Sequence, residues 1–162
     1  MDPVIVDTNV PLVANGAAEQ ASIECQLACI AELSVVQRTK VCLLDSDGAI
    51  LGQYLKQKPH GYPQGPGDAF LVWVYDNQAN PDRCRIVSVT PIDDPIRLYE
   101  EFPDDVELIG FDRDEHKFVA VAIAHGDSPP ILNASDTDWK IFEVPLRKHG
   151  IGVKFLCPDL MG

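Results

Sequence analysis

Acidic residues directly precede or follow apolar stretches in three distant parts of the chain. Asp7 ends the first such run, an acidic group at residues 112–115 opens a helical stretch, and Asp136 and Asp138 follow a third run. Carboxylates packed close together repel one another, so a converged cluster stays ionised only around a hard cation with oxygen ligands. A single acid of this kind is usually a helix cap or a solvated residue. All three groups together predict a Mg²⁺ or Mn²⁺ site, provided that the fold brings them together.

The elements that would position these acids alternate between strands and helices. Apolar runs predict short strands at residues 3–7, 40–45, 85–89, 130–133 and 153–157. Helical spacing predicts helices over residues 22–36, 49–58, 68–78, 112–124 and 139–149, and one helical turn within residues 96–102. Glycines and prolines predict an exposed loop over residues 60–67. Ser22 and Asp68 are expected to cap the helices that they begin. The alternation predicts an α/β fold with a parallel sheet covered by helices on both faces, whose carboxyl edge gathers the acids.

Length, charge and cysteine content limit the classes of protein to which the chain could belong. The 162 residues fit one domain, residues 1–162, and the formal net charge of −12 argues against nucleic-acid binding through a basic surface. No apolar stretch approaches the roughly 20 residues that span a bilayer, so no membrane association is expected. The five cysteines are scattered and odd in number, which favours free thiols in a reducing compartment, the cytoplasm, over disulfides or a structural zinc site.

Three segments together resemble the PIN-domain (PilT N-terminus-like) nuclease family. These are residues 4–10 (VIVDTNV), 115–126 (EHKFVAVAIAHG) and 131–139 (ILNASDTDW). The resemblance runs from residue 3 to about residue 157, although residues 40–110 match only in their α/β character. It implies a PIN-like three-layer α/β/α fold with a central parallel sheet of four to five strands.

The resemblance also implies a set of metal ligands. In that family a first-strand Asp, a helix Glu, an acid that opens a later helix and an Asp after the fourth strand hold the metal. Asp7 and Asp136 match directly. The candidates for the other positions are Glu24, with Glu32 as the fallback, and Glu115, which is favoured over the neighbouring Asp114. Asp138 is expected as a second-metal or outer acid, and Asp112 as an outer one.

The activity implied by the resemblance is metal-dependent endoribonuclease hydrolysis of RNA phosphodiester bonds, with Mg²⁺ or Mn²⁺ as cofactor. Thr8, Asn9 and Lys117 are the expected substrate-binding residues. Further phosphate contacts are candidates at Arg38, Lys40, Arg113 and Lys140. Use as a toxin or defence component would add a protein inhibitor or antitoxin as a partner, and homodimerisation is expected around Trp73 and Tyr75.

Two other functions stay open from the sequence. Residues 43–51 (LLDSDGAIL) look like the opening motif of haloacid-dehalogenase-type phosphatases, in which Asp45 would be the nucleophile. In that family the motif follows the first strand, whereas here a complete strand and helix precede it. The other alternative is a non-catalytic PIN-like scaffold that binds a protein partner. This alternative stays open because position 115 holds a glutamate where the family usually has an aspartate.

Overall fold

The central feature of the computed structural model is a five-stranded parallel sheet. The structure describes residues 1–18, 20–57 and 65–160, and within them the strand order is β3-β2-β1-β4-β5. The strands are β1 (Asp2–Val6), β2 (Lys40–Asp45), β3 (Cys84–Val87), β4 (Ile131–Asn133) and β5 (Val153–Phe155), and every neighbouring pair is parallel. The first strand therefore lies in the middle, between β2 and β4. This arrangement places the carboxyl ends of β1 and β4 side by side.

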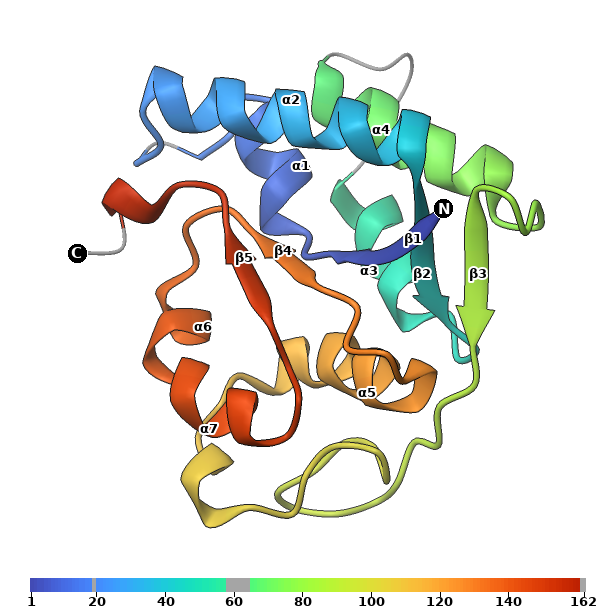
Figure 1. Ribbon diagram of the computed structural model, residues 1–162, viewed down its shortest axis with the longest axis vertical. Helices are drawn as coiled ribbons and strands as arrows, with labels where there is room; N and C mark the ends of the chain where they lie inside the picture. The colour runs from blue at the N-terminus through green and yellow to red at the C-terminus, as the bar shows by residue number, and fades with distance from the viewer. Residues whose placement is uncertain (19, 58–64, 161–162) are drawn as a thin grey trace.

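Helices cover both faces of this sheet and give the expected three-layer α/β/α architecture (Figure 1). On one side lie α1 (Asn9–Ala14), α2 (Ile23–Thr39) and α4 (Pro66–Asn77), which pack against one another. On the other side lie α5 (His116–His125), α6 (Thr137–Ile141) and α7 (Glu143–Lys148). The helix α3 (Ala49–Gln57) contacts β2, α4 and α5. Three 3₁₀ turns complete the described elements: η1 (Val106–Leu108), η2 (Arg113–Glu115) and η3 (Pro158–Leu160).

Local chemistry explains where two of these helices begin. Ser22 caps α2 as expected, since its Oγ accepts a hydrogen bond from the Cys25 backbone N–H at 3.1 Å. Helix α4 begins earlier than predicted, with Pro66 at its first position, and Asp68 is not its cap. Instead Asp68 is buried and accepts a hydrogen bond from Asn15 Nδ2 at 2.8 Å. A Cβ on Gly67 would lie 1.9 Å from the Pro11 carbonyl oxygen, so only glycine lets α4 approach α1 this closely.

Three sequence predictions about the elements need correction. Helix α1 was not predicted, because its six residues are too few to show a helical period. The helix predicted over residues 139–149 is broken at Phe142 into α6 and α7, and Pro145 explains the break, because it has no N–H and its ring clashes with the carbonyl four residues earlier. Residues 96–102 form bends and turns in place of a helical turn, with an isolated bridge between Pro91 and Tyr99. Most of the loop predicted over residues 60–67 lies outside the described residues.

The cysteines also differ from the prediction of free thiols. A disulfide joins Cys25 at the start of α2 to Cys157 after β5, whereas Cys29, Cys42 and Cys84 are free and buried. The two bonded residues are 132 positions apart, so their pairing is a product of the tertiary fold that spacing in the sequence does not reveal.

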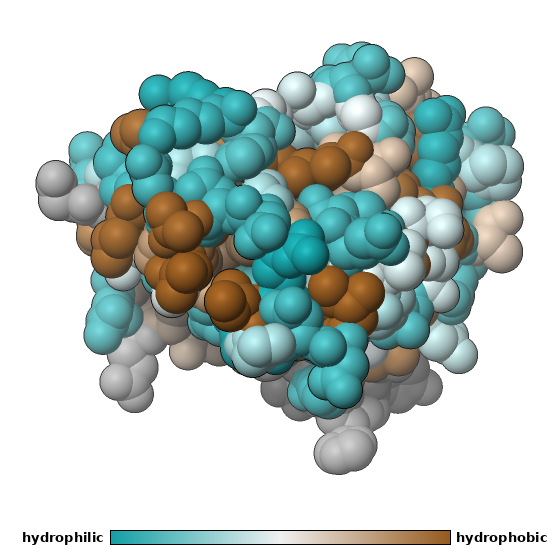
Figure 2. All heavy atoms as spheres, turned by 90° about the horizontal axis from the view of Figure 1, so that it is seen from below, coloured by the Kyte–Doolittle hydropathy of each residue, from teal (hydrophilic) through white to brown (hydrophobic). Residues whose placement is uncertain are grey.

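The surface around α7 and the segment before α5 is mixed in character. Figure 2 shows this side of the molecule, where apolar side chains form separate groups among hydrophilic ones. The exposed apolar residues of the segment before α5 and of the α6–α7 region are Ile96, Val106, Ile109, Ile141 and Val144. Among the helices described, none has the length and apolar character needed to cross a bilayer.

Candidate metal centre

Three of the predicted acids converge at the carboxyl edge of the sheet. One carboxylate oxygen from each of Asp7, Glu115 and Asp136 lies within 4.8 Å of the others. Asp7 directly follows β1, Asp136 follows β4, and Glu115 ends the 3₁₀ turn that leads into α5. The parallel pairing of β1 with β4 and the position of the 3₁₀ turn before α5 therefore bring together residues from three distant parts of the sequence. Carboxylate oxygens at this separation are suited to a hard divalent cation.

Asp7 is held in place from two directions. The Trp139 indole donates a hydrogen bond from Nε1 to Asp7 Oδ2 at 2.6 Å, and the Asn9 backbone N–H donates to Asp7 Oδ1 at 3.1 Å. Trp139 is fully buried, and its ring meets Phe111 edge to face, so the indole has little freedom to turn away. Both oxygens of Asp7 thus have a fixed orientation before any cation binds.

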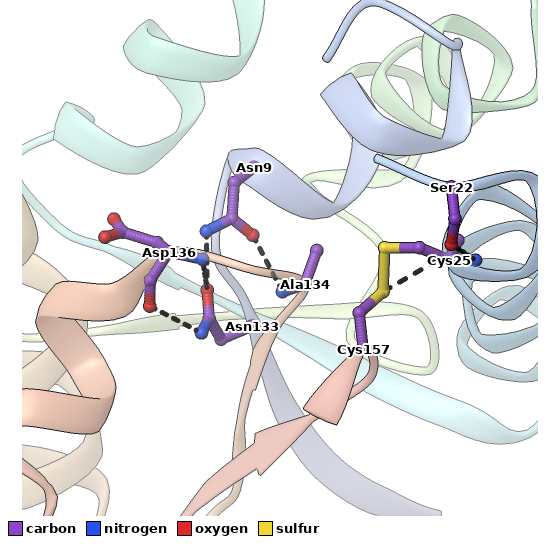
Figure 3. The surroundings of a disulfide bond; sticks show 7 residues. All are labelled: Asn9, Ser22, Cys25, Asn133, Ala134, Asp136 and Cys157. Atoms are coloured by element: carbon purple, nitrogen blue, oxygen red, sulfur yellow. Dashed lines mark hydrogen bonds between the residues drawn. A yellow bond between two sulfur atoms is a disulfide. The ribbon is translucent and has the colours of Figure 1, made fainter. Parts of the chain in front are cut away.

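Asp136 is positioned through the asparagine that ends β4. Asn133 Nδ2 donates to the Asp136 carbonyl oxygen at 3.0 Å, and the Asp136 N–H donates to Asn133 Oδ1 at 3.3 Å. Asn9 holds this turn from the other strand, because its Nδ2 donates to Asn133 Oδ1 at 2.5 Å and its Oδ1 accepts from the Ala134 N–H at 2.9 Å. The two asparagines therefore fix Asp7 and Asp136 relative to each other, as Figure 3 shows for the Asp136 side.

Glu115 is buried, and its pKa is strongly raised. Its residue surface is 7% exposed, and its Oε2 has no hydrogen-bond partner among the described residues. Burial, followed by the negative charges of Asp7 and Asp136, raises the pKa of Glu115 to about 10. Burial also raises the pKa of Asp136, and the charge of Asp7 acts in the same direction. Without a cation Glu115 therefore retains a proton at neutral pH.

The acid cluster adjoins a hollow that carries two lysines. A cavity of about 430 Å³ is lined by Ala49, Gly52, Gln53 and Lys56 of α3 and by Asp114 and Lys117. Lys117 is buried, and its Nζ donates to the Asp114 carbonyl oxygen. Burial lowers the pKa of Lys117, whereas the charges of Glu115 and Asp114 oppose this effect. Gln53 Oε1 is buried without a partner among the described residues, so the hollow contains both cationic and unpaired polar groups.

The side chains of Thr8 and Asn9, the two predicted substrate-binding residues after Asp7, differ in their hydrogen bonding. Asn9 has the structural hydrogen bonds described above. Thr8 is buried, and its Oγ1 has no hydrogen-bond partner within the described part of the chain, although its neighbour is Asp7. An unpaired buried hydroxyl is costly, which makes it a candidate ligand for water or phosphate at this edge.

The other predicted metal ligands lie outside the converged group. Glu24 is exposed in the first turn of α2 and lines a small pocket beside Cys157. The fallback, Glu32, pairs with Lys154 at 3.1 Å and lines a cavity at the opposite end of the sheet. Helix α2 therefore presents neither glutamate to the cluster, because Glu24 points to solvent and Glu32 lies near the amino ends of the strands.

Asp114 and Asp138 flank the cluster without joining it. Asp114 is exposed, whereas its neighbour Glu115 belongs to the converged group. Asp138 Oδ2 accepts a hydrogen bond from the Asp112 N–H at 2.9 Å and so ties α6 to the turn before Glu115. Burial raises the pKa of Asp138, and the charges of Asp136 and Asp112 add to this increase. Asp138 and Asp112 are therefore neighbours that shape the loop around the site.

Four cationic residues considered as phosphate contacts are engaged elsewhere. Lys40 pairs with Asp2 at the amino edge of the sheet, and Lys140 pairs with Glu143. Arg38 donates to the Ser34 carbonyl oxygen and Arg113 to that of Pro95. Of the predicted cations, Lys117 is the one that lies beside the acids.

His116 begins α5 and is buried. Its ring stacks on Phe102 with centroids 3.8 Å apart, its Nε2 lies 3.2 Å from the Phe111 carbonyl oxygen, and its Nδ1 accepts from the Leu98 N–H at 3.4 Å. Burial lowers its pKa, so the ring is neutral at pH 7. His116 thus fixes the segment before α5 and supports the position of Glu115.

Asp45, the nucleophile of the phosphatase alternative, serves as a helix cap. Its Oδ2 accepts from the Ala49 N–H at 2.9 Å and its Oδ1 accepts from the Ile50 N–H at 2.8 Å. The residue is 2% exposed, whereas Asp47, which would be the acid/base of that motif, is exposed. This geometry explains the motif as the turn between β2 and α3.

Several residues of the site were not predicted from the sequence. Trp139, Asn133, Gln53 and Lys56 were not singled out as site residues. Asn133 was detectable in principle, because it ends a strand at the edge where the acids gather. The indole contact depends on how α6 packs over β1, which no local pattern encodes.

Comparisons with known proteins do not place the chain in a family. No family model matches it, and neither curated proteins nor solved structures yield a match. The functional interpretation therefore depends on the geometry of the site and on the sequence resemblance.

Proposed function

We propose that the chain is a PIN-like, metal-dependent endoribonuclease that uses Mg²⁺ or Mn²⁺ at Asp7, Glu115 and Asp136. The observation that supports this most is the convergence of three carboxylates within 4.8 Å at one edge of a parallel sheet. The buried, unpaired Oε2 of Glu115 adds to it, since an orphaned carboxylate oxygen is costly unless a cation or proton compensates it.

The residues fit such a cation in number and in chemistry. All three donors are carboxylate oxygens, which Mg²⁺ and Mn²⁺ prefer, and no sulfur or imidazole stands among them. Burial, followed by the negative charges of Asp7 and Asp136, raises the pKa of Glu115 to about 10, and a cation would relieve the repulsion between these charges. Hydrogen bonds from Trp139 and Asn9 orient Asp7, as outer partners do in metal sites.

In this mechanism, a bound cation supplies Lewis acidity that favours attack of water on a phosphodiester and offsets charge on the leaving oxygen. The chain's own residues would position the phosphate relative to the three acids. Lys117 and Lys56 line the adjoining hollow, where they would face phosphate oxygens, and Gln53 would donate its amide. The buried Trp139 keeps water away from one side of Asp7. No serine or cysteine nucleophile is required.

The hollow and the charge of the chain favour single-stranded or locally unpaired RNA. A net charge of −12 disfavours the binding of a duplex across a broad surface, and the two lysines of the hollow suit contact with a few phosphates. Binding should weaken as salt concentration rises. An inhibitor or antitoxin would belong to this function if the chain acts as a toxin, and the acidic surface would favour a basic partner. The exposed Tyr75 remains a candidate contact for a homodimer.

A cytoplasmic location is part of this proposal, because RNA is the substrate. Three of the five cysteines are free thiols, which is compatible with a reducing compartment. The disulfide between Cys25 and Cys157 would then be exposed to cellular reductants.

Cleavage of labelled single-stranded RNA by the purified chain tests the proposal. Mn²⁺ or Mg²⁺ should support cleavage and EDTA should abolish it. Asp7→Asn and Asp136→Asn should each lower the rate by more than the roughly 10- to 100-fold that loss of an outer partner costs. Glu24→Gln is the matched control and should retain activity. Equal rates in all four proteins would overturn the proposal.

Asp45 separates this function from its alternatives. Asp45→Ala should cost about 1–2 kcal/mol of stability through loss of the α3 cap, while RNA cleavage persists at temperatures where the variant is folded. Loss of phosphate release from a generic phosphate ester in this variant would instead identify a phosphatase. A wild-type chain that binds Mn²⁺ yet cleaves no RNA would favour the scaffold.

A further inference from the structure

The disulfide between Cys25 and Cys157 joins two segments that meet next to the residues that hold Asp136. Cys25 lies in the first turn of α2, and Cys157 follows the edge strand β5. Figure 3 shows the bond on one side of Ala134 and Asn133, with Asp136 on the other side.

Backbone hydrogen bonds connect the Cys157 segment to the turn after β4. The Leu156 N–H donates to the Asn133 carbonyl oxygen at 2.8 Å, and the Cys157 N–H donates to the Ala134 carbonyl oxygen at 3.2 Å. The N–H of the same Ala134 donates to Asn9, whose amide holds Asn133. Displacement of residues 156–157 would therefore disturb both asparagine contacts that position Asp136.

Apart from the disulfide, this segment is held by the backbone hydrogen bonds above, by the Lys154–Glu32 ion pair and by the partly buried side chains of Val153, Phe155 and Leu156. Strand β5 has three residues, Val153–Phe155, and pairs with β4 alone. Within residues 152–160, Cys157 is the one fully buried residue, and Pro158 to Leu160 are exposed. A short edge strand with so little buried surface is marginal by itself.

A small surface pocket borders both bonded cysteines. A pocket of about 90 Å³ is lined by Ser22, Glu24, Cys25 and Cys157, together with residues 158–160 and Leu156. Cys29 lies on the other side, with its sulfur within 4.8 Å of both bonded cysteines. Burial raises the pKa of the Cys29 thiol to about 12, so it stays protonated at neutral pH and does not exchange readily with the bond.

We propose that the Cys25–Cys157 disulfide is a redox switch that controls the acid cluster, so that the oxidised chain binds the divalent cation more tightly than the reduced chain. The proposal rests on the metal-dependent function proposed above. Its mechanism is release of residues 156–160 from β4, followed by loosening of the turn that carries Asp136.

The chemical step needs a dithiol reductant. One thiolate of the reductant attacks a sulfur of the bond, the Cys25–Cys157 linkage breaks, and the released cysteine takes up a proton. The second thiol of the reductant loses its proton and attacks the mixed disulfide, which frees the other cysteine as a thiol. Two electrons and two protons pass to the chain, and the reductant leaves as a cyclic disulfide.

The test compares Mn²⁺ affinity and hydrogen exchange in the oxidised chain and in the chain reduced by dithiothreitol and desalted without oxygen. Reduction should weaken Mn²⁺ binding by at least about five-fold. It should also speed exchange at residues 133–136 and 156–160. Cys157→Ser should behave like the reduced chain in both conditions, and Cys29→Ser should keep the full response to reduction. Equal Mn²⁺ affinity in the two redox states would overturn the switch.

Failure of the metal function can be distinguished from failure of the switch. If neither redox state binds Mn²⁺, the metal proposal is wrong, and hydrogen exchange alone then decides whether the bond controls the turn. Unchanged exchange at residues 133–136 would overturn the switch. Loss of the redox response in Cys29→Ser would also overturn it, because the responsive bond would then involve Cys29.

Discussion

The side-chain amide of Asn9 donates to Asn133 Oδ1 over 2.5 Å and so joins the start of α1 to the end of β4. The contact crosses from the central strand to its neighbour at the point where the chain turns toward Asp7 and Asp136. Because both amides also bond to the backbone around them, the pair sets the separation of the two carboxylates. Neither asparagine needs to touch a cation to influence its binding.

Loss of either asparagine should weaken the same interaction. Asn9→Ala and Asn133→Ala should each lower the free energy of unfolding and Mn²⁺ affinity, and the double variant should lose less than the sum of the two. A coupling energy of about 1 kcal/mol is expected for one buried side-chain hydrogen bond. Denaturant unfolding of the four proteins measures it. Additive losses would show that the amides act independently.

Trp139 should affect metal affinity without contributing a ligand. In Trp139→Phe the apolar contacts with Phe111 persist, but the hydrogen bond to Asp7 Oδ2 is lost, so Mn²⁺ affinity should fall about 10-fold. Titration calorimetry with Mn²⁺ measures the change. Trp73→Phe is the matched control, since Trp73 packs against Phe70 away from the acids, and its affinity should match that of the wild type.

The strands and the acids at their ends could be predicted because both depend on local pattern. An apolar run that ends in Asp7 predicts a buried strand with an acid at its carboxyl edge, and the same logic places Asp136. Glu24 lies outside the converged group, and the sequence does not show this because the helical period gives the length of α2 but not the direction in which its first turn faces. The Trp139 and Cys157 contacts depend on the packing of segments more than 100 residues apart, which no short window of sequence contains.

The state of the cysteines predicts the reactivity of the chain toward a thiol reagent. In denaturant without reductant, the three free thiols should react, and prior reduction should raise the number to five. In the native chain labelling should be slow. Burial raises the pKa of Cys84 to about 11 and raises those of Cys29 and Cys42, so few thiolates form. A colorimetric thiol count measures all three conditions, and five reactive thiols without reductant would contradict the disulfide.

Glu115 should make the stability of the metal-free chain depend on pH. Its pKa is about 10 in the folded chain and near 4.5 when unfolded, so folding takes up a proton between these values and stability falls as pH rises. The slope should reach at most about 1.4 kcal/mol per pH unit. Glu115→Gln removes this proton uptake, so the variant should gain stability over the wild type as pH rises, although it should lose Mn²⁺ affinity. Urea unfolding in EDTA from about pH 5 to about pH 9 measures the difference, with exposed Glu24→Gln as the control that should follow the wild type. Parallel stability curves for Glu115→Gln and the wild type would show that Glu115 is ionised in the folded chain without a cation, contrary to the burial and repulsion described for the cluster.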